Sequence, residues 1–147
     1  MTKRHLLPTL AAIGLGGGMT FAIPALPAVA FHSPPEVISV EVGDEATIVA
    51  RGAAVLVPIE VTCPAGSQGF LSTRVTQRAG RRIASGNGFT EVTCTGSTQV
   101  VDVLVQAQGG GQAFKKGTAV AEATLSTCGG FFFCTTVSDT ETIQIVR

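Results

Sequence analysis

The sequence predicts an all-β fold, a single antiparallel β-sandwich of about seven strands that follows a signal peptide. Three observations support this prediction. Apolar and polar residues alternate with period two in several short segments, Gly-rich turns separate these segments, and no stretch after residue 30 has helical periodicity. Short strands at regular spacing with turns between them are typical of an antiparallel sandwich.

The first 30 residues are typical of a signal peptide. Lys3 and Arg4 supply the positive start, Leu6–Ile23 is uncharged and mostly apolar, and Ala28–Ala30 supplies small residues before a cleavage site. We expect cleavage before Phe31 rather than retention as an anchor, because prolines and glycines interrupt the apolar stretch. The sequence therefore predicts a secreted, extracellular protein with no stable membrane anchor.

The predicted organisation has three parts: the signal peptide over residues 1–30, a Pro-rich leader over 31–36 and the sandwich over 37–147. The last part is long enough for one domain with a modest core. The chain carries ten basic and ten acidic residues, and the signal peptide takes Lys3 and Arg4 with it. Since a nucleic-acid binder is expected to be clearly basic, we expect no nucleic-acid partner.

The first two predicted strands lie at residues 38–42 and 54–63. In the first, three aliphatic residues alternate with Ser39 and Glu41. In the second, every odd-numbered residue is apolar and would point to one face. Pro58 inside it indicates an edge strand or a bulge, because proline donates no hydrogen bond to a sheet.

Five further segments complete the predicted sandwich. Strands are expected at residues 70–78, at 82–85 continuing to 89–94, and at 99–107, 118–127 and 135–146, with turns at 64–69, 79–80, 86–88, 109–111 and 129–130 and the longest loop at 108–115. The expected core consists of the aliphatic residues that alternation places inward: Val57, Ile59, Val61, Leu71, Val75, Val103, Val105, Ala121, Ala123, Leu125, Ile143 and Ile145.

The four cysteines predict two disulfides rather than metal ligands or redox thiols, because we expect the chain to be exported. Three pairings are possible. We favour Cys63 with Cys94, since each ends a predicted strand after Val-Thr, and Cys128 with Cys134, since they bracket a five-residue loop. On a chain-entropy estimate the longer link contributes roughly 3 to 4 kcal/mol and the shorter roughly 2.

The arrangement of strands and cysteines resembles two groups of proteins. The short strands and the segment Cys128-Gly-Gly-Phe-Phe-Phe-Cys134 resemble the small secreted immunoglobulin-like domains of actinobacteria. The segments Ala46-Thr-Ile-Val-Ala-Arg-Gly, Ile83-Ala-Ser-Gly and Lys116-Gly-Thr-Ala-Val-Ala look like those of uncharacterised exported proteins of that group. This resemblance implies an immunoglobulin-like sandwich and no particular activity.

In architecture the chain is also similar to the neocarzinostatin family, seven-stranded carriers of enediyne chromophores with a short disulfide in a late hairpin. The similarity covers the strand plan and the late cysteine pair. The loop between Cys63 and Cys94 is much longer than the loop closed by that family's first disulfide, so the chromophore site is not carried over.

The sequence offers little catalytic chemistry. His32 is the only histidine after the cleavage site, and it lies in the leader, where no third group would hold it. The cysteines lack metal-finger spacing, so we expect no metal and no cofactor. Asp139 and Glu141 would share a strand face and bind calcium at best loosely; we interpret them as a solvent-facing row. The sequence therefore predicts no catalytic residues and no enzyme.

Four arginines form a predicted basic cluster. Arg74 and Arg78 would share the outer face of one strand, and Arg81 and Arg82 follow the turn at 79–80. Such a cluster would be able to bind phosphate or sulfate groups of a wall polymer or glycan. The alternative, which we favour, is that the charges protect an exposed strand edge from aggregation.

The Phe-rich loop between Cys128 and Cys134 is the predicted recognition site. Phe131, Phe132 and Phe133 cannot all point inward from a five-residue loop, and a disulfide below the loop lowers the entropy lost on binding. The alternative, to which we give more weight, is that the rings cap the open end of the core and meet Phe70, Phe89 or Phe114.

Two function classes follow from these features. The first is a non-enzymatic binding module that recognises a small apolar ligand, or a cell-wall or extracellular protein surface, through the Phe-rich loop. The second is a structural, self-assembling surface protein, which the apolar run at residues 100–105 supports. A ligand carrier should remain monomeric, whereas a coat protein should assemble as its concentration rises.

Overall fold

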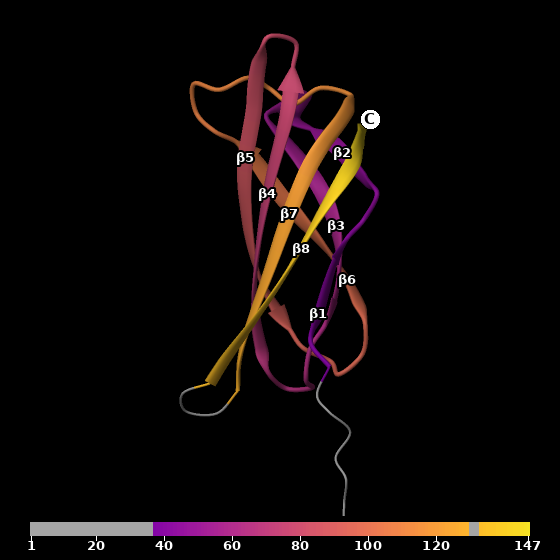
Figure 1. Ribbon diagram of the computed structural model, residues 1–147, viewed down its shortest axis with the longest axis vertical. Helices are drawn as coiled ribbons and strands as arrows, with labels where there is room; N and C mark the ends of the chain where they lie inside the picture. The colour runs from indigo at the N-terminus through magenta and orange to yellow at the C-terminus, as the bar shows by residue number, and fades with distance from the viewer. Residues whose placement is uncertain (1–36, 130–132) are drawn as a thin grey trace, which may run out of the picture. The chain divides into compact units, whose positions relative to one another are not determined.

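A computed structural model describes residues 37–129 and 133–147, which belong to one compact unit, Pro34–Arg147. The unit contains β1 (Ser39–Val42), β2 (Glu45–Val49), β3 (Ala54–Thr62), β4 (Gln68–Ala79), β5 (Arg82–Thr93), β6 (Gln99–Ala107), β7 (Gly117–Gly129) and β8 (Phe133–Val146) (Figure 1). A turn of 3-10 helix, η1 (Ala50–Gly52), joins β2 to β3. Strands make up 72% of the structure, so the predicted all-β class is confirmed.

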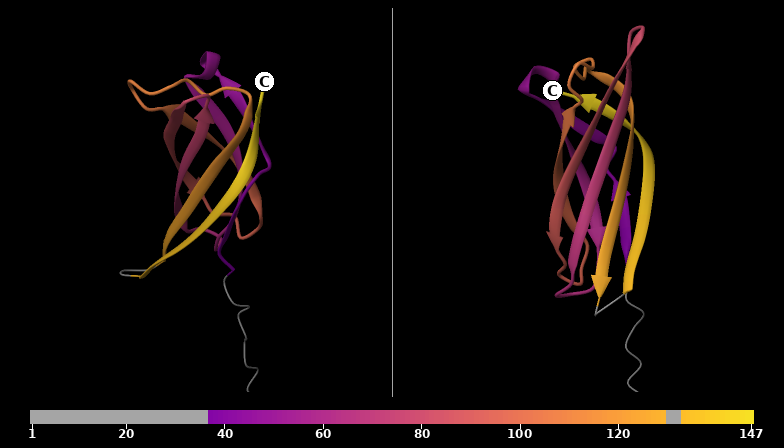
Figure 2. Two further views of the ribbon diagram at one scale, coloured as in Figure 1. Left: turned by 45° about the horizontal axis from the view of Figure 1, so that its top comes forward. Right: turned by 90° about the vertical axis from the view of Figure 1, so that its left-hand side faces the viewer.

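The predicted immunoglobulin-like sandwich is wrong, because the strands close into a β-barrel. Hydrogen-bonded neighbours follow the order β3-β2-β8-β7-β4-β5-β6, and β6 pairs again with β3, so seven strands complete the circle. β1 pairs with β3 on the same side as β2. The β2–β8 pair is parallel, which makes the barrel mixed rather than antiparallel. Figure 2 shows these strands from two further directions.

Strand β2 closes the barrel between β3 and β8, and it runs parallel to β8. The sequence predicted no strand here, because β2 has only five residues and Ala46 alone among them is fully buried. Residues 47–49 of β2 pair with β3. Residues 45–47 pair with the end of β8. β2 therefore joins two groups of strands that a sandwich would leave separate.

Gly86 and Gly88 allow the barrel to close between β5 and β6. The turn predicted at residues 86–88 is wrong, since these residues lie inside β5, a continuous strand of 12 residues. A Cβ atom on Gly86 would collide with the backbone oxygen of Gln106, and one on Gly88 with that of Leu104. The glycines thus allow β5 to approach β6 closely enough to pair.

Aliphatic side chains fill the interior of the barrel. Every residue of the predicted core set is buried, from Val57 on β3 to Ile145 on β8. Phe114, in the loop between β6 and β7, is the largest buried side chain among the residues that the structure describes. Because the interior is packed, a ligand site has to lie on the outer surface or at an end of the barrel.

Pro58 lies in a strand with partners on both sides, so the predicted edge position is wrong. The predicted irregularity is present on one side, because the register shifts by two residues between Val42↔Ile59 and Thr47↔Leu56. The carbonyl oxygen of Pro58 accepts a hydrogen bond from Gly43 N at 3.0 Å. In a strand the N–H and C=O of one residue point the same way, so the missing donor also faces Gly43, where the chain steps from β1 to β2. The ladder to β6 therefore loses no hydrogen bond to the proline.

Both predicted disulfides are confirmed. Cys63–Cys94 lies at the ends of β3 and β5 and is buried, whereas Cys128–Cys134 joins β7 to β8 and is exposed. Two disulfides indicate an oxidising compartment. In residues 37–129 and 133–147 the structure contains no helix that is long and apolar enough to cross a membrane.

Candidate functional site

Two exposed phenylalanines mark the outer face of β4 and β5. Phe70 on β4 is 53% exposed and Phe89 on β5 is 80% exposed. Phe70 pairs with Glu91 and Ser72 pairs with Phe89, so the two rings are diagonal neighbours on adjacent strands. Diagonal neighbours in an antiparallel pair are about 7 to 8 Å apart, so one ligand can contact both rings.

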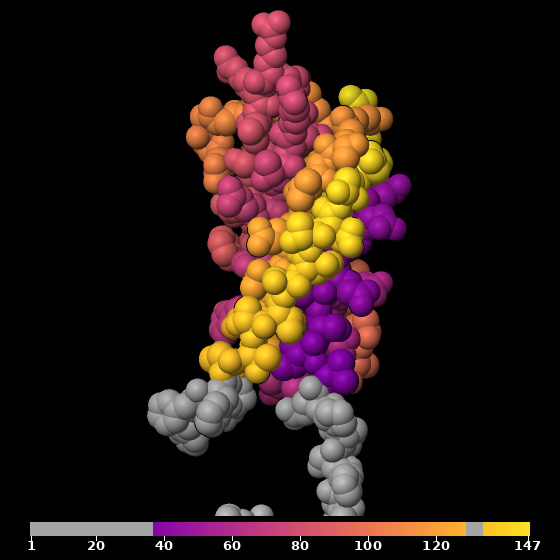
Figure 3. Space-filling model, in the orientation of Figure 1, coloured from indigo at the N-terminus to yellow at the C-terminus, as the bar shows by residue number. Residues whose placement is uncertain are grey.

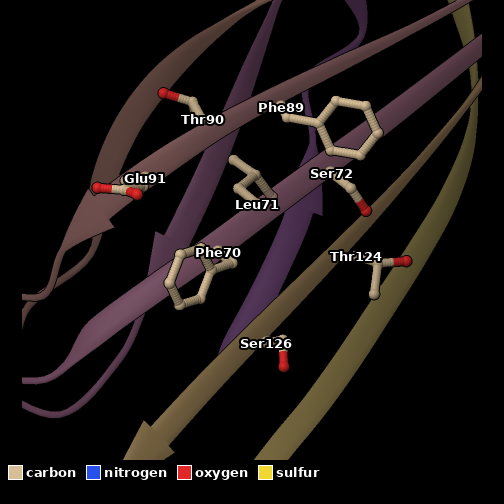
Figure 4. Close-up of a pocket in the computed structure, with 8 residues that line it drawn as sticks. All are labelled: Phe70, Leu71, Ser72, Phe89, Thr90, Glu91, Thr124 and Ser126. Atoms are coloured by element: carbon tan, nitrogen blue, oxygen red, sulfur yellow. The ribbon is translucent and has the colours of Figure 1, made fainter.

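An open cavity of about 470 Å³ lies at these rings, and we call it the Phe70–Phe89 pocket. Figure 4 shows the two rings from β4 and β5, with Thr124 and Ser126 of β7 along the other side. Ser72 and Glu91 add a hydroxyl and a carboxylate. Aromatic surface with a few polar groups around it is typical of ligand sites.

The strands hold the floor of this pocket rigidly. β4 pairs with β5 from Gln68 to Ala79 and with β7 from Gln68 to Thr76. Leu71 lies below the pocket, is 1% exposed and pairs with Leu125 on β7. A ligand would therefore meet rings whose backbone is already ordered, which lowers the entropy cost of binding.

The alternation of inward and outward residues would have predicted from the sequence that Phe70 and Phe89 are exposed, but the sequence prediction did not use it for these residues. The inward residues of β4 are odd-numbered and those of β5 are even-numbered, so Phe70 and Phe89 have the parity of the outer face. Phe114 is buried instead, with an exposed fraction of 2%. An aromatic residue on the polar face of a strand is thus the feature that sequence inspection should look for.

The predicted recognition loop lies largely outside the described residues. This holds for Phe131 and Phe132 and for the side chain of Phe133, whose backbone begins β8. The base of the hairpin is described: Cys128 and Cys134 pair across β7 and β8. Cys128 follows Ser126 by two residues on β7, so the base of the hairpin lies on the same outer face as the Phe70–Phe89 pocket.

The four predicted anion-binding arginines divide into two places. Arg78, Arg81 and Arg82 are exposed at the tip of the β4–β5 hairpin, which projects beyond its neighbours in Figure 3. Arg74 lies lower on β4, opposite Glu122 on β7. Arg74 has strand partners on both sides, so it does not protect a sheet edge. Arg78 and Arg82 lie where β4 and β5 pair only with each other among the described residues, so edge protection stays a prediction for them.

Asp139 has a structural role in place of the solvent-facing one that we expected. Its Oδ2 accepts a hydrogen bond from Val42 N at 2.8 Å, and its Oδ1 accepts one from Thr140 N at 2.8 Å. The carboxylate therefore ties β1 to β8, which share no ladder. Within the described ranges no three metal-ligating side chains come together, and His32 lies outside those ranges.

Comparison with known proteins gives no family: no protein-family model matches this chain, and no curated protein matches it. The resemblances to secreted actinobacterial domains and to the neocarzinostatin family therefore stay predictions. The function has to be inferred from the Phe70–Phe89 pocket and the surfaces around it.

Proposed function

We propose that this protein is a secreted, non-enzymatic binding module that holds a ligand with an apolar face in the Phe70–Phe89 pocket. The observation that carries the proposal is the pair of exposed rings on a rigid part of the sheet. Large aromatic side chains left in water forgo the hydrophobic gain of burial, and exposed apolar patches commonly mark interaction sites. The two disulfides support the extracellular location that residues 1–30 predict.

The size of the aromatic surface limits what the rings achieve alone. Burying the exposed parts of Phe70 and Phe89 removes on the order of 250 Å² of apolar surface, worth about 6 kcal/mol. Association costs about 4 kcal/mol or more in lost freedom of motion. The hydroxyl groups of Ser72, Thr124 and Ser126 therefore have to contribute hydrogen bonds, so the ligand combines an apolar face with polar groups at its edge.

The Phe-rich loop extends the proposed binding surface. Phe131–Phe133 follow the disulfide-bonded residue Cys128, which lies on the same outer face as Ser126. The sequence predicts that at least one of these rings is exposed. An apolar ligand or a protein surface larger than the pocket would then contact both aromatic groups.

A binding titration tests the proposal. The probe is N-phenyl-1-naphthylamine, a neutral dye that fluoresces in apolar sites, added to the mature protein at low concentration. We expect saturable binding that Phe70→Ser/Phe89→Ser reduces at least tenfold, because the aromatic surface is lost. The matched control is Val100→Ser, which removes an exposed apolar side chain of β6 and should change the affinity less than twofold. Equal affinity of the two variants would contradict the proposal.

Self-association is the second candidate function, and the edge of β5 favours it. β5 pairs with β6 only through Gly86 and Asn87, and Gly88 packs against the backbone of Leu104, so Phe89–Thr93 has no strand partner on that side among the described residues. Unpaired edges of this kind can pair with a second chain. Sedimentation velocity over a wide concentration range distinguishes the two functions, since the binding module stays monomeric and the coat protein assembles.

A further inference from the structure

A second cavity, of about 660 Å³, opens at one end of the barrel. It is lined by Ile48, Arg51, Phe114, Lys115, Lys116 and Arg147. No carboxylate side chain belongs to this lining. Arg51, Lys115 and Lys116 bring three cations together next to the apolar side chains of Ile48 and Phe114.

Arg51 is presented by a turn that the fold holds in an unusual conformation. Ala50 and Arg51 have φ angles of 48° and 58°, and Gly52 has 92°. Residues other than glycine adopt such angles uncommonly and keep them only where their surroundings impose them. Here Phe114 N donates a hydrogen bond to Gly52 O at 2.8 Å, and a Cβ on residue 52 would collide with the Phe114 carbonyl. The turn is therefore fixed against the loop that carries the two lysines.

Gln77 fixes the lysine segment from the other side. Its side chain is 3% exposed. Gln77 Nε2 donates a hydrogen bond to Lys115 O at 2.7 Å, and Lys115 N donates one to Gln77 Oε1 at 2.8 Å. One buried amide thus satisfies both backbone groups of Lys115 and positions Lys116 next to it. The backbone that carries Arg51, Lys115 and Lys116 is therefore ordered in the absence of a ligand.

Other charges strengthen this end of the barrel as an anion site. The tip of the β4–β5 hairpin, with Arg78, Arg81 and Arg82, lies at the same end as η1 and residue 147 (Figures 1 and 2). The described acidic residues lie on strands or at the step between β1 and β2: Glu41, Asp44, Glu45, Glu60, Glu91, Asp102, Glu122, Asp139 and Glu141. Among the described basic residues only Arg74 lies away from this end of the barrel, so the end attracts anions although the chain as a whole has no net charge.

We propose that this cavity binds a phosphate- or sulfate-bearing ligand. The guanidinium group of Arg51 suits bidentate contact with a tetrahedral oxyanion, and Lys115 and Lys116 add two point charges. Ile48 and Phe114 contact the carbon skeleton that carries the anion. A cavity of this size holds more than an inorganic ion, and it suits a molecule of the size of a phosphorylated sugar. A small phosphate ester and a phosphate group within a polymer offer the same anion to the cavity, so the test below includes probes of both kinds.

The test is calorimetry at low ionic strength with glucose 6-phosphate, glucose 6-sulfate, inorganic polyphosphate and glucose as probes. We expect saturable binding of an anionic sugar and none of glucose. Arg51→Gly/Lys116→Gln should weaken this binding at least tenfold, because two charge-assisted contacts are lost. Glycine at position 51 suits the φ angle there, so the variant should fold.

The matched control is Arg82→Gln, which removes a cation at the same end but outside the cavity. It should weaken binding of the anionic sugar less than twofold, and polyphosphate should compete with that sugar. The proposal is overturned if neither anionic sugar binds saturably, if glucose binds as well as they do, or if Arg82→Gln weakens binding as much as the cavity variant. The cavity is separate from the Phe70–Phe89 pocket, so these results leave the dye titration unaffected.

Discussion

Replacement of Gln77 tests whether one buried amide holds the lysine segment in place. Gln77→Met keeps the length of the side chain and removes both hydrogen bonds to Lys115. Each such bond contributes about 1 kcal/mol net, and a backbone group left unpaired costs more where water cannot reach it. Lys115 itself is exposed, so water replaces part of the loss. We expect the free energy of unfolding to fall by about 2 to 3 kcal/mol.

Gln77→Glu gives the same test a pH dependence. Above neutral pH a carboxylate would face the Lys115 carbonyl in a buried site, so the pKa of the new glutamate in the folded state should rise above its unfolded value of about 4.3. Below that value the protonated acid donates to Lys115 O as the amide does, and the variant should approach the wild type. Its stability should then decrease as the pH rises through the folded-state pKa.

Urea denaturation followed by far-UV circular dichroism measures both variants. The control is Arg78→Gln on the exposed outer face of β4, which should stay within about 0.5 kcal/mol of the wild type. The reasoning is refuted if Gln77→Met also stays within that range, or if Gln77→Glu shows the same difference from wild type at every pH.

Three further predictions concern interactions that stabilise the barrel. Gly86→Ala and Gly88→Ala should each lower the free energy of unfolding by about 1 to 3 kcal/mol, because β5 can no longer approach β6. Gly109→Ala is the control, since a Cβ atom there meets no neighbour, and thermal melts should show a lower melting temperature for the first two variants only. Replacing Cys63 and Cys94 by Ala should cost roughly 3 to 4 kcal/mol and replacing Cys128 and Cys134 roughly 2 in denaturant titrations, and the reverse order would contradict the loop-length argument. Asp139→Ala should cost about 1 to 3 kcal/mol, while Asp139→Asn keeps an acceptor for Val42 N and should recover most of it; equal unfolding midpoints for the two would exclude this role.

Local patterns predicted the contents of the barrel but not its closure. Alternation identified the buried residues of the long strands, such as Val57, Leu71 and Ile143, because one face of each strand has to be apolar. It failed at β2, whose five residues give too little periodicity to detect. It also failed at Gly86, because a glycine that permits close packing looks in the sequence like a glycine in a turn.

The candidate sites depend even more on which strands become neighbours. The pairings of Cys63 with Cys94 and Cys128 with Cys134 could be favoured from strand ends and loop length alone. The Phe70–Phe89 pocket could not, because it requires the register between β4 and β5. The basic cavity joins Arg51 to Lys115 across more than sixty residues, and no local pattern reports such a contact.

The most direct test of the proposed function is to map the bound dye by NMR on ¹⁵N-labelled mature protein. The account predicts that N-phenyl-1-naphthylamine shifts the amide signals of residues 69–73, 88–92 and 123–127, which surround the Phe70–Phe89 pocket, and leaves those of β3 and β6 unchanged. Shifts centred on β3 and β6, or shifts of the pocket residues that persist in Phe70→Ser/Phe89→Ser, would contradict it.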